Sequence, residues 1–270
     1  MSDTIKIAIA GLGAVGMPVA KWLDQGVPGL QLVAVSAGDM ARAKERVADF
    51  KSPPPILPLA DLAEVADIVV EALPPSKYLE IAVPVIEAGK TLVAVTVSQL
   101  LDNMDLIERA RQTGGRIIVP TGALAAFDAI RAAAKGTINS LVMATRKPPS
   151  SFAKVQFVKD MGLDMETLSE PVCLYKGSVR GVAQSFPANV NVAVALSLAG
   201  IGPDKTQYEI WADPGVSRNT HSVVLDSEET HLEFSIAGRQ SAENPATGAL
   251  TPLAVMTTLE SMVSPLRIGS

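Results

Sequence analysis

The sequence has little of what several common chemistries require. It holds one cysteine, Cys173, in 270 residues, so no intrachain disulfide can form and a reducing compartment is expected. It has no Cys-x-x-Cys pair and only two histidines, His221 and His231, so no metal site is predicted. A Gly-x-Ser-x-Gly elbow and a Gly-x-x-x-x-Gly-Lys-[Ser/Thr] loop are both missing. Neither a serine hydrolase nor a P-loop nucleotidase is therefore supported.

Basic runs and long apolar runs are missing too. The formal net charge is −5, and no cluster of Lys and Arg stands out, so nucleic acid is not an expected partner. No run of about 18 apolar residues occurs, and the first residues lack the pattern of a signal peptide. We therefore expect a cytoplasmic protein with no membrane partner. Hydrophobic residues make up 48% and charged residues 19%, which predicts a substantial core in one large or two modest domains.

The first half alternates short apolar runs with helical patterns, which predicts βαβ architecture. Such runs are typical of a parallel sheet with helices on both faces. We expect a dinucleotide-binding Rossmann domain over residues 1–120. The predicted strands are 5–10, 30–36, 67–72, 91–97 and 116–119, and the predicted helices are 14–25, 40–49, 62–65, 78–88 and 105–113.

After Pro120 the pattern changes to helices and extended segments of a mostly antiparallel sheet. We expect an α+β domain for substrate binding and dimerisation over residues 121–245. A C-terminal segment, 246–270, is expected to pack its helix back on the Rossmann domain. The predicted helices are 123–134, 190–198 and 250–263, and the predicted strands are 140–146, 206–212, 221–225 and 231–236.

A glycine-rich loop lies directly between the first predicted strand and the first helix. Its residues are Gly11, Leu12, Gly13, Ala14, Val15 and Gly16. The first glycine permits a tight turn, the second lets the backbone approach a pyrophosphate, and the third lets helix and strand pack closely. Free N–H groups and the helix dipole then attract the phosphates. In this context the loop predicts that the chain binds NAD or NADP.

The end of the second predicted strand is expected to contact the adenosine ribose. NAD-specific sites usually place Asp or Glu there, whereas this sequence has Ser36, with Asp39 slightly late. Without a carboxylate at the strand end, nothing there repels a 2′-phosphate, so NADP is plausible and NAD stays open. Arg42 and Lys44 lie nearby, although ordinary solvated helix charges explain both.

His221 is the candidate for proton transfer, because histidine is the usual residue for that role near neutral pH. It follows Arg218-Asn219-Thr220 at a predicted junction of loop and strand, where a side chain can point into a cleft. His231 falls in an alternating strand opposite the apolar face, so we interpret it as solvent-facing.

Two further segments carry candidate ligand contacts. In Phe186-Pro187-Ala188-Asn189-Val190-Asn191, Asn189 is interpreted as an ordinary helix cap, whereas Asn191 lies inside the first turn. Its amide could serve the nicotinamide end of the cofactor or remain a satisfied buried group. The small residues of 121–126, Ala125 among them, let backbone amides approach a ligand at the carboxyl edge of the sheet.

In these motifs the chain resembles the L-aspartate dehydrogenases over nearly its whole length. The motifs are the glycine loop, 121–126, Arg146-Lys147-Pro148-Pro149, 186–193, Asp213-Pro214 with 218–221, and Glu243-Asn244-Pro245. The resemblance implies NAD(P)-dependent, reversible oxidation of L-aspartate to iminosuccinate, which hydrolyses to oxaloacetate and ammonia or feeds NAD biosynthesis. It implies His221 as the active-site residue, Asn191 and Ala125 as cofactor contacts, and a homodimer.

Other interpretations of the sequence stay open. One is a related dehydrogenase acting on another small amino acid, and another is a non-catalytic NAD(P)-binding sensor. A dihydrodipicolinate reductase is weakly supported, since the paired-histidine motif of that family is missing. The two carboxylates of aspartate need cations; Arg146, Lys147 and Lys176 are candidates by residue type, but we interpret each as a surface charge.

Overall fold

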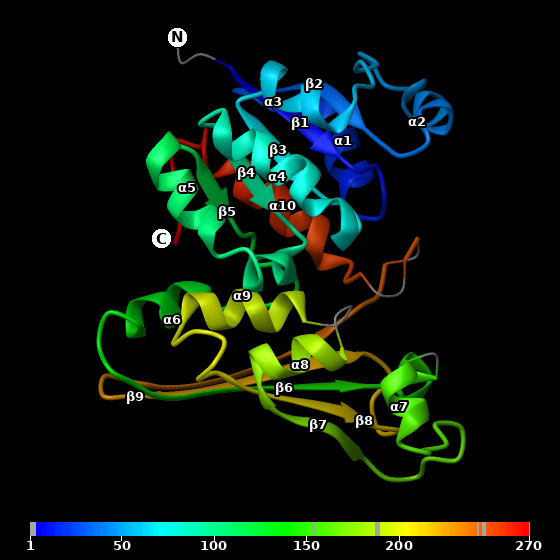
Figure 1. Ribbon diagram of the computed structural model, residues 1–270, viewed down its shortest axis with the longest axis vertical. Helices are drawn as coiled ribbons and strands as arrows, with labels where there is room; N and C mark the ends of the chain where they lie inside the picture. Colours follow the sequence, from blue (N-terminus) through cyan, green and yellow to red (C-terminus); the bar gives the residue numbers. More distant parts are fainter. Residues whose placement is uncertain (1–3, 154, 187–189, 242, 245–246, 270) are drawn as a thin grey trace. The chain divides into compact units, whose positions relative to one another are not determined.

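A computed structural model describes residues 4–153, 155–186, 190–241, 243–244 and 247–269. The predicted helix cap Asn189 and the motif residue Pro245 lie outside these described residues. The chain forms two compact units, Met1–Gly122 with Thr251–Ser270 and Ala123–Leu250, and Figure 1 shows the elements of each.

The first unit is built on a five-stranded parallel sheet in the order β2-β1-β3-β4-β5. Its strands are β1 (Ile5–Ala10), β2 (Leu30–Ser36), β3 (Ile68–Glu71), β4 (Thr91–Ala94) and β5 (Arg116–Ile118). Its helices are α1 (Gly16–Asp24), α2 (Met40–Val47), α3 (Leu62–Val65), α4 (Tyr78–Glu87), α5 (Asp105–Thr113) and α10 (Leu250–Glu260). The β3 strand is buried along its whole length, as expected for a central parallel strand with both faces covered.

The helix α10 belongs to the first unit although it comes from the far end of the chain. Val255 and Leu259 are fully buried and share one hydrophobic cluster with Ile9 of β1 and Val35 of β2. Burying two such side chains stabilises the unit by about 1.5–3 kcal/mol each.

The second unit contains a mostly antiparallel sheet in the order β10-β9-β6-β8-β7, in which only the β6–β8 pair is parallel. Its strands are β6 (Ile138–Lys147), β7 (Val172–Ser178), β8 (Gln207–Ala212), β9 (Asn219–Ser227) and β10 (His231–Gly238). Its helices are α6 (Phe127–Ala133), α7 (Gln156–Asp160), α8 (Val179–Ser185) and α9 (Asn191–Ala199). The predicted fold class, a Rossmann domain followed by an α+β domain, is confirmed.

Among the residues that the structure describes, helices cover one face of this second sheet and leave the other open. Figure 1 shows α6, α8 and α9 together on one side of β6, β7 and β8. Every second residue of β6 from Leu141 to Lys147 is buried, and the residues between them are half-buried. This alternation follows from the period of two along a strand.

Some predicted elements are wrong at their ends. Residues 123–126 are not helical, and α6 begins only at Phe127. The predicted strand 91–97 ends at Ala94, and a 3-10 helix occupies Val97–Leu101. The strand β7 and the helix α8 have no counterpart among the predicted elements. In the described part of the chain, no helix is long and apolar enough to cross a membrane.

Candidate active site

The glycine loop leaves the carboxyl end of β1 in the geometry that its three glycines predict. Gly11 has φ of 99°, and a Cβ there would collide with the carbonyl oxygen of Ala72. A Cβ on Gly16 would collide with the carbonyl oxygen of Gly11. A Cβ on Gly13 would meet nothing within 4 Å. The first and third glycines are therefore required by the fold, whereas the second leaves its space open for a ligand.

The ribose end of this loop carries no free carboxylate among the described residues. Ser36 is 3% exposed and its carbonyl oxygen accepts a hydrogen bond from the Gly11 N–H at 2.8 Å. The carboxylate of Asp39 caps α2 by accepting from the Arg42 N–H at 2.9 Å. Arg42 itself is exposed, in agreement with a solvated helix charge.

Sequence reasoning missed one cation beside the glycine loop. The guanidinium of Arg46, on α2, donates to the carbonyl oxygen of Leu12. Arg46 lies ten positions after Ser36 in the sequence, and its proximity to the loop depends on how α2 packs. A positive charge here suits a phosphate-bearing ligand.

A buried carboxylate, Glu71, holds together the two loops that follow β3 and β4. Its side chain is 0% exposed. One oxygen accepts from the Leu73 N–H and the Thr96 hydroxyl at 2.8 Å each, and the other accepts from the N–H groups of Val95 at 3.1 Å and Thr96 at 2.9 Å. Burial raises the pKa of Glu71, and the four hydrogen bonds oppose that rise.

We expect Glu71→Gln to destabilise the first unit by about 2–4 kcal/mol, because an amide nitrogen cannot accept the donors that face the carboxylate. Chemical denaturation measures this free energy of unfolding. Glu64, which is exposed on α3, supplies the matched control, and Glu64→Gln should change stability by less than about 0.5 kcal/mol. Equal stability of the two variants would contradict the role assigned to Glu71.

In the second unit, His221 lies on the helix-covered face of the sheet. It is the third residue of β9, is 9% exposed, and pairs across the strands with Thr145 of β6. His221 Nδ1 lies 2.9 Å from the Thr145 hydroxyl oxygen. The Tyr208 hydroxyl of β8 donates to that same oxygen at 2.8 Å. Three neighbouring strands therefore orient the imidazole.

The ring of His221 is neutral at physiological pH. Burial, together with the positive charge of Lys147, lowers the pKa of His221 to about 4. Lys147 is only 8% exposed, and burial lowers its pKa to about 8. The interpretation of Lys147 as a surface charge is therefore wrong, because the last residue of β6 points to the covered face.

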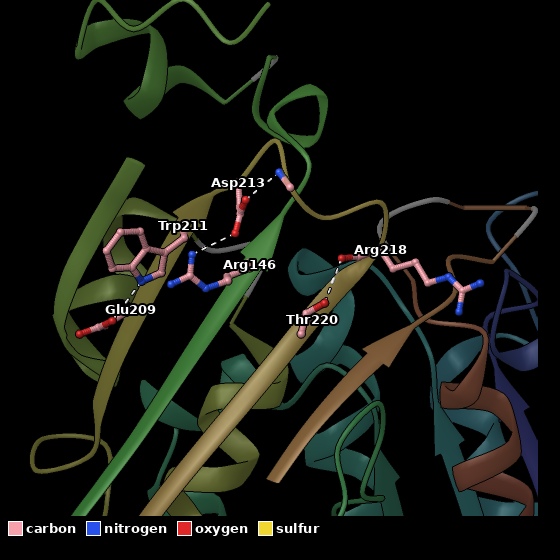
Figure 2. A network of polar contacts seen from close by, with 7 residues as sticks. Arg146, Glu209, Trp211, Asp213, Arg218 and Thr220 are labelled. Atoms are coloured by element: carbon pink, nitrogen blue, oxygen red, sulfur yellow. Dashed lines mark hydrogen bonds and ion pairs between the residues drawn. The ribbon is translucent and has the colours of Figure 1, made fainter. Parts of the chain in front are cut away.

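The other two candidate cations lie on the opposite face of the sheet. Figure 2 shows Arg146 beside Trp211 and Asp213, and its guanidinium donates to the Asp213 carboxylate at 2.9 Å. The same guanidinium lies 4.7 Å from the centre of the Trp211 ring. Lys176 pairs with Glu209 at 2.8 Å and is 73% exposed. Both residues are thus already held in ion pairs away from His221.

The remaining candidates take distinct positions. Ala125 is exposed and precedes Ala126, whose φ of 60° is the only positive value among described residues other than glycine. A left-handed alanine is strained by about 1–2 kcal/mol, and such strain is typical of functional segments.

Asn191 is the first residue of α9 and is half-buried. His231 is exposed and lies 3.6 Å from Asp226, so its solvent-facing position is confirmed.

The glycine loop offers the geometry that a dinucleotide requires. The open space at Gly13 and the loop N-terminal to α1 form a cradle for a pyrophosphate. Among the residues that the structure describes, no group of three or more His, Cys, Asp or Glu side chains could hold a metal.

These features define a dinucleotide-binding protein with a separate α+β unit. Two family models match it: "Homoserine dehydrogenase, NAD binding domain" over residues 11–120 and "Aspartate dehydrogenase, C-terminal" over residues 128–262. The chain belongs to the L-aspartate dehydrogenase family. The match of the first unit also confirms the predicted cofactor class, NAD or NADP.

Relatives and solved structures agree with this assignment. The chain is 46% identical to an L-aspartate dehydrogenase of Bradyrhizobium diazoefficiens, covering 100% of this chain and 95% of the relative. It is 45% identical to "L-aspartate dehydrogenase 3" of Bordetella bronchiseptica, covering 99% and 98%. The crystal structure of aspartate dehydrogenase from Thermotoga maritima has the same fold, with a TM-score of 0.74 at 21% identity, covering 98% and 99%.

Proposed function

We propose that this chain is an NAD(P)-dependent L-aspartate dehydrogenase. It oxidises the C–N bond of L-aspartate reversibly to iminosuccinate, which hydrolyses to oxaloacetate and ammonia. The observation that carries this proposal is a buried, neutral His221, oriented by Thr145 and Tyr208, in a member of a family whose relatives are named for this activity.

The two units have separate tasks in this proposal. The bound cofactor supplies a hydride acceptor. The glycine loop would hold its pyrophosphate through Gly11, Leu12, Gly13, Ala14, Val15 and Gly16, and Ser36 would lie at its ribose. Ala125, through its backbone, and Asn191 would contact its nicotinamide end. The second unit binds the amino acid beside His221, and hydride transfer requires that substrate and cofactor be held in a defined geometry.

His221 moves a proton in this mechanism. When Nδ1–H donates to the Thr145 hydroxyl oxygen, Nε2 keeps its lone pair and can accept a proton. That proton comes from the substrate ammonium before hydride leaves, or from the water that attacks the imine. The two carboxylates of the substrate bring negative charge near the ring, which raises the pKa of His221 from its low value in the free protein.

A substrate panel tests the proposed reaction. L-aspartate, L-asparagine, L-glutamate and L-alanine are each mixed with the protein and NAD or NADP while the absorbance of reduced nicotinamide is followed. We expect turnover that is fastest with L-aspartate. Turnover with another amino acid alone would favour a related dehydrogenase. No turnover in either direction, together with intact cofactor binding, would favour a sensor.

We further propose a homodimer formed by the uncovered face of the second sheet. Half-buried Val142, Ala144 and Val224 lie on this face, opposite the side that α6, α8 and α9 cover. Such an apolar strip fits a second copy of the chain. Light scattering should give twice the chain mass of 28.2 kDa, and Val224→Lys should give a monomer. A monomeric wild type would refute this arrangement.

The cytoplasmic location that the sequence predicts stays a prediction.

A further inference from the structure

Three polar side chains, those of His221, Lys147 and Asn219, lie at one end of the second sheet on its helix-covered face. In the register of β6 and β9, Thr145 lies opposite His221, and Arg146 lies opposite Thr220. One further step along these antiparallel strands places Lys147 opposite Asn219, on the same face as His221. The recorded pairing of β6 with β9 ends at Arg146 and Thr220, so Lys147, the last residue of β6, and Asn219, the first residue of β9, stand next to each other in the extrapolated register.

The side-chain oxygen of Asn219, Oδ1, is buried and has no hydrogen-bond donor among the described residues. A buried amide oxygen without a donor is costly and rare in folded proteins. The same strand end therefore offers a cation on one side chain and an unused acceptor on the next.

We propose that Lys147 and Asn219 bind the amino-acid substrate beside His221, with Lys147 Nζ contacting a carboxylate and Asn219 Oδ1 accepting a hydrogen bond from the ammonium. This inference rests on the proposed function for the identity of the substrate. It assigns both residues as substrate contacts, one for each kind of charge that an amino acid carries.

The positions of the other charges favour Lys147 for this role. Arg146 and Lys176 pair with Asp213 and Glu209 on the opposite face. Lys147 also lowers the pKa of His221 through its charge. A carboxylate bound at Lys147 cancels that charge, so binding of substrate prepares His221 to accept a proton.

Calorimetric titration with two ligands separates the roles of the two residues. Succinate has two carboxylates and no amine, whereas L-aspartate has both groups. Each ligand is titrated into protein saturated with reduced cofactor, so that no oxidation occurs. We expect Lys147→Met to weaken both ligands by about 30-fold or more. We expect Asn219→Ala to weaken L-aspartate by about tenfold and to leave succinate within about twofold.

Lys205, an exposed lysine of the same unit, supplies the control. Lys205→Met should bind both ligands like the wild type. Thermal melting checks that Lys147→Met and Lys205→Met are folded before their affinities are compared. If Lys147→Met does not fold, Lys147→Arg takes its place: it keeps the cation and should bind succinate measurably.

The outcomes distinguish this proposal from the proposed function. Folded Lys147→Met protein with wild-type affinity for both ligands would overturn the carboxylate contact, whether or not the wild type oxidises L-aspartate. Wild-type protein that binds neither ligand would overturn it as well. If the wild type binds succinate through Lys147 but does not oxidise L-aspartate, the binding site stands and the proposed reaction falls.

Discussion

His221→Asn is expected to lower kcat for L-aspartate by about 10²–10⁴-fold, the usual contribution of a positioned proton-transfer group. The neutral imidazole is buried, and Thr145 and Tyr208 fix its orientation. Asparagine can keep a hydrogen bond to Thr145 but cannot accept a proton near neutral pH. Steady-state kinetics measures the loss, and fluorescence titration with reduced cofactor should give a dissociation constant close to that of the wild type.

The second histidine provides the control for this result. His231 is exposed near Asp226, so His231→Asn should keep wild-type turnover. If His221→Asn lost less than about threefold in kcat, a proton-transfer role for His221 would be excluded.

His221→Asn also changes how the free energy of unfolding depends on pH. The folded pKa of His221 is about 4, below the ordinary value of 6.5. Between these values the unfolded chain binds a proton that the folded chain excludes. The contribution of this group is therefore fully present above pH 6.5, and about 3 kcal/mol is lost as the pH falls through the folded pKa. His221→Asn should lack this part of the acid dependence, which denaturation at a series of pH values measures.

Gly13→Val is expected to leave the fold intact and to weaken cofactor binding by about 10–100-fold. A Cβ at Gly13 would meet no atom within 4 Å, so we expect the fold to accept a side chain there. The added methyl groups occupy the space through which the pyrophosphate approaches the backbone, and such overpacking costs about 1–3 kcal/mol. Fluorescence titration of NADH and NADPH measures the effect.

Gly16→Val separates this binding effect from a folding effect. Its Cβ would collide with the carbonyl oxygen of Gly11, so this variant should lose stability whether or not cofactor is present. A Gly13→Val protein that binds cofactor like the wild type would show that the pyrophosphate does not approach the loop at this position.

The first unit can be predicted from the sequence because its signals are local. Each buried parallel strand is a continuous apolar run, and the glycine loop is a short motif whose spacing sets its own geometry. The contact of Arg46 with Leu12 cannot be predicted in this way, since it depends on the packing of α2 against the loop.

The second unit is harder to predict for a physical reason. The face to which a side chain points depends on strand register, which the sequence of one strand does not show. The sequence alone therefore gives no way to tell the roles of the adjacent cations Arg146 and Lys147 apart. In the structure the two side chains point to opposite faces of β6. Residues 123–126 have a helical composition, yet Ala126 adopts a left-handed conformation that alanine does not favour.

The most direct test of the proposed reaction follows the hydrogen at C2 of L-aspartate. L-aspartate deuterated at C2 is incubated with the protein and oxidised cofactor, and the reduced cofactor is examined by NMR and mass spectrometry. The proposed reaction predicts one deuterium at C4 of the nicotinamide ring and the release of ammonia. Two results would contradict the proposed reaction. One is reduced cofactor that carries no deuterium, and the other is the absence of reduced cofactor when the protein binds both L-aspartate and the cofactor.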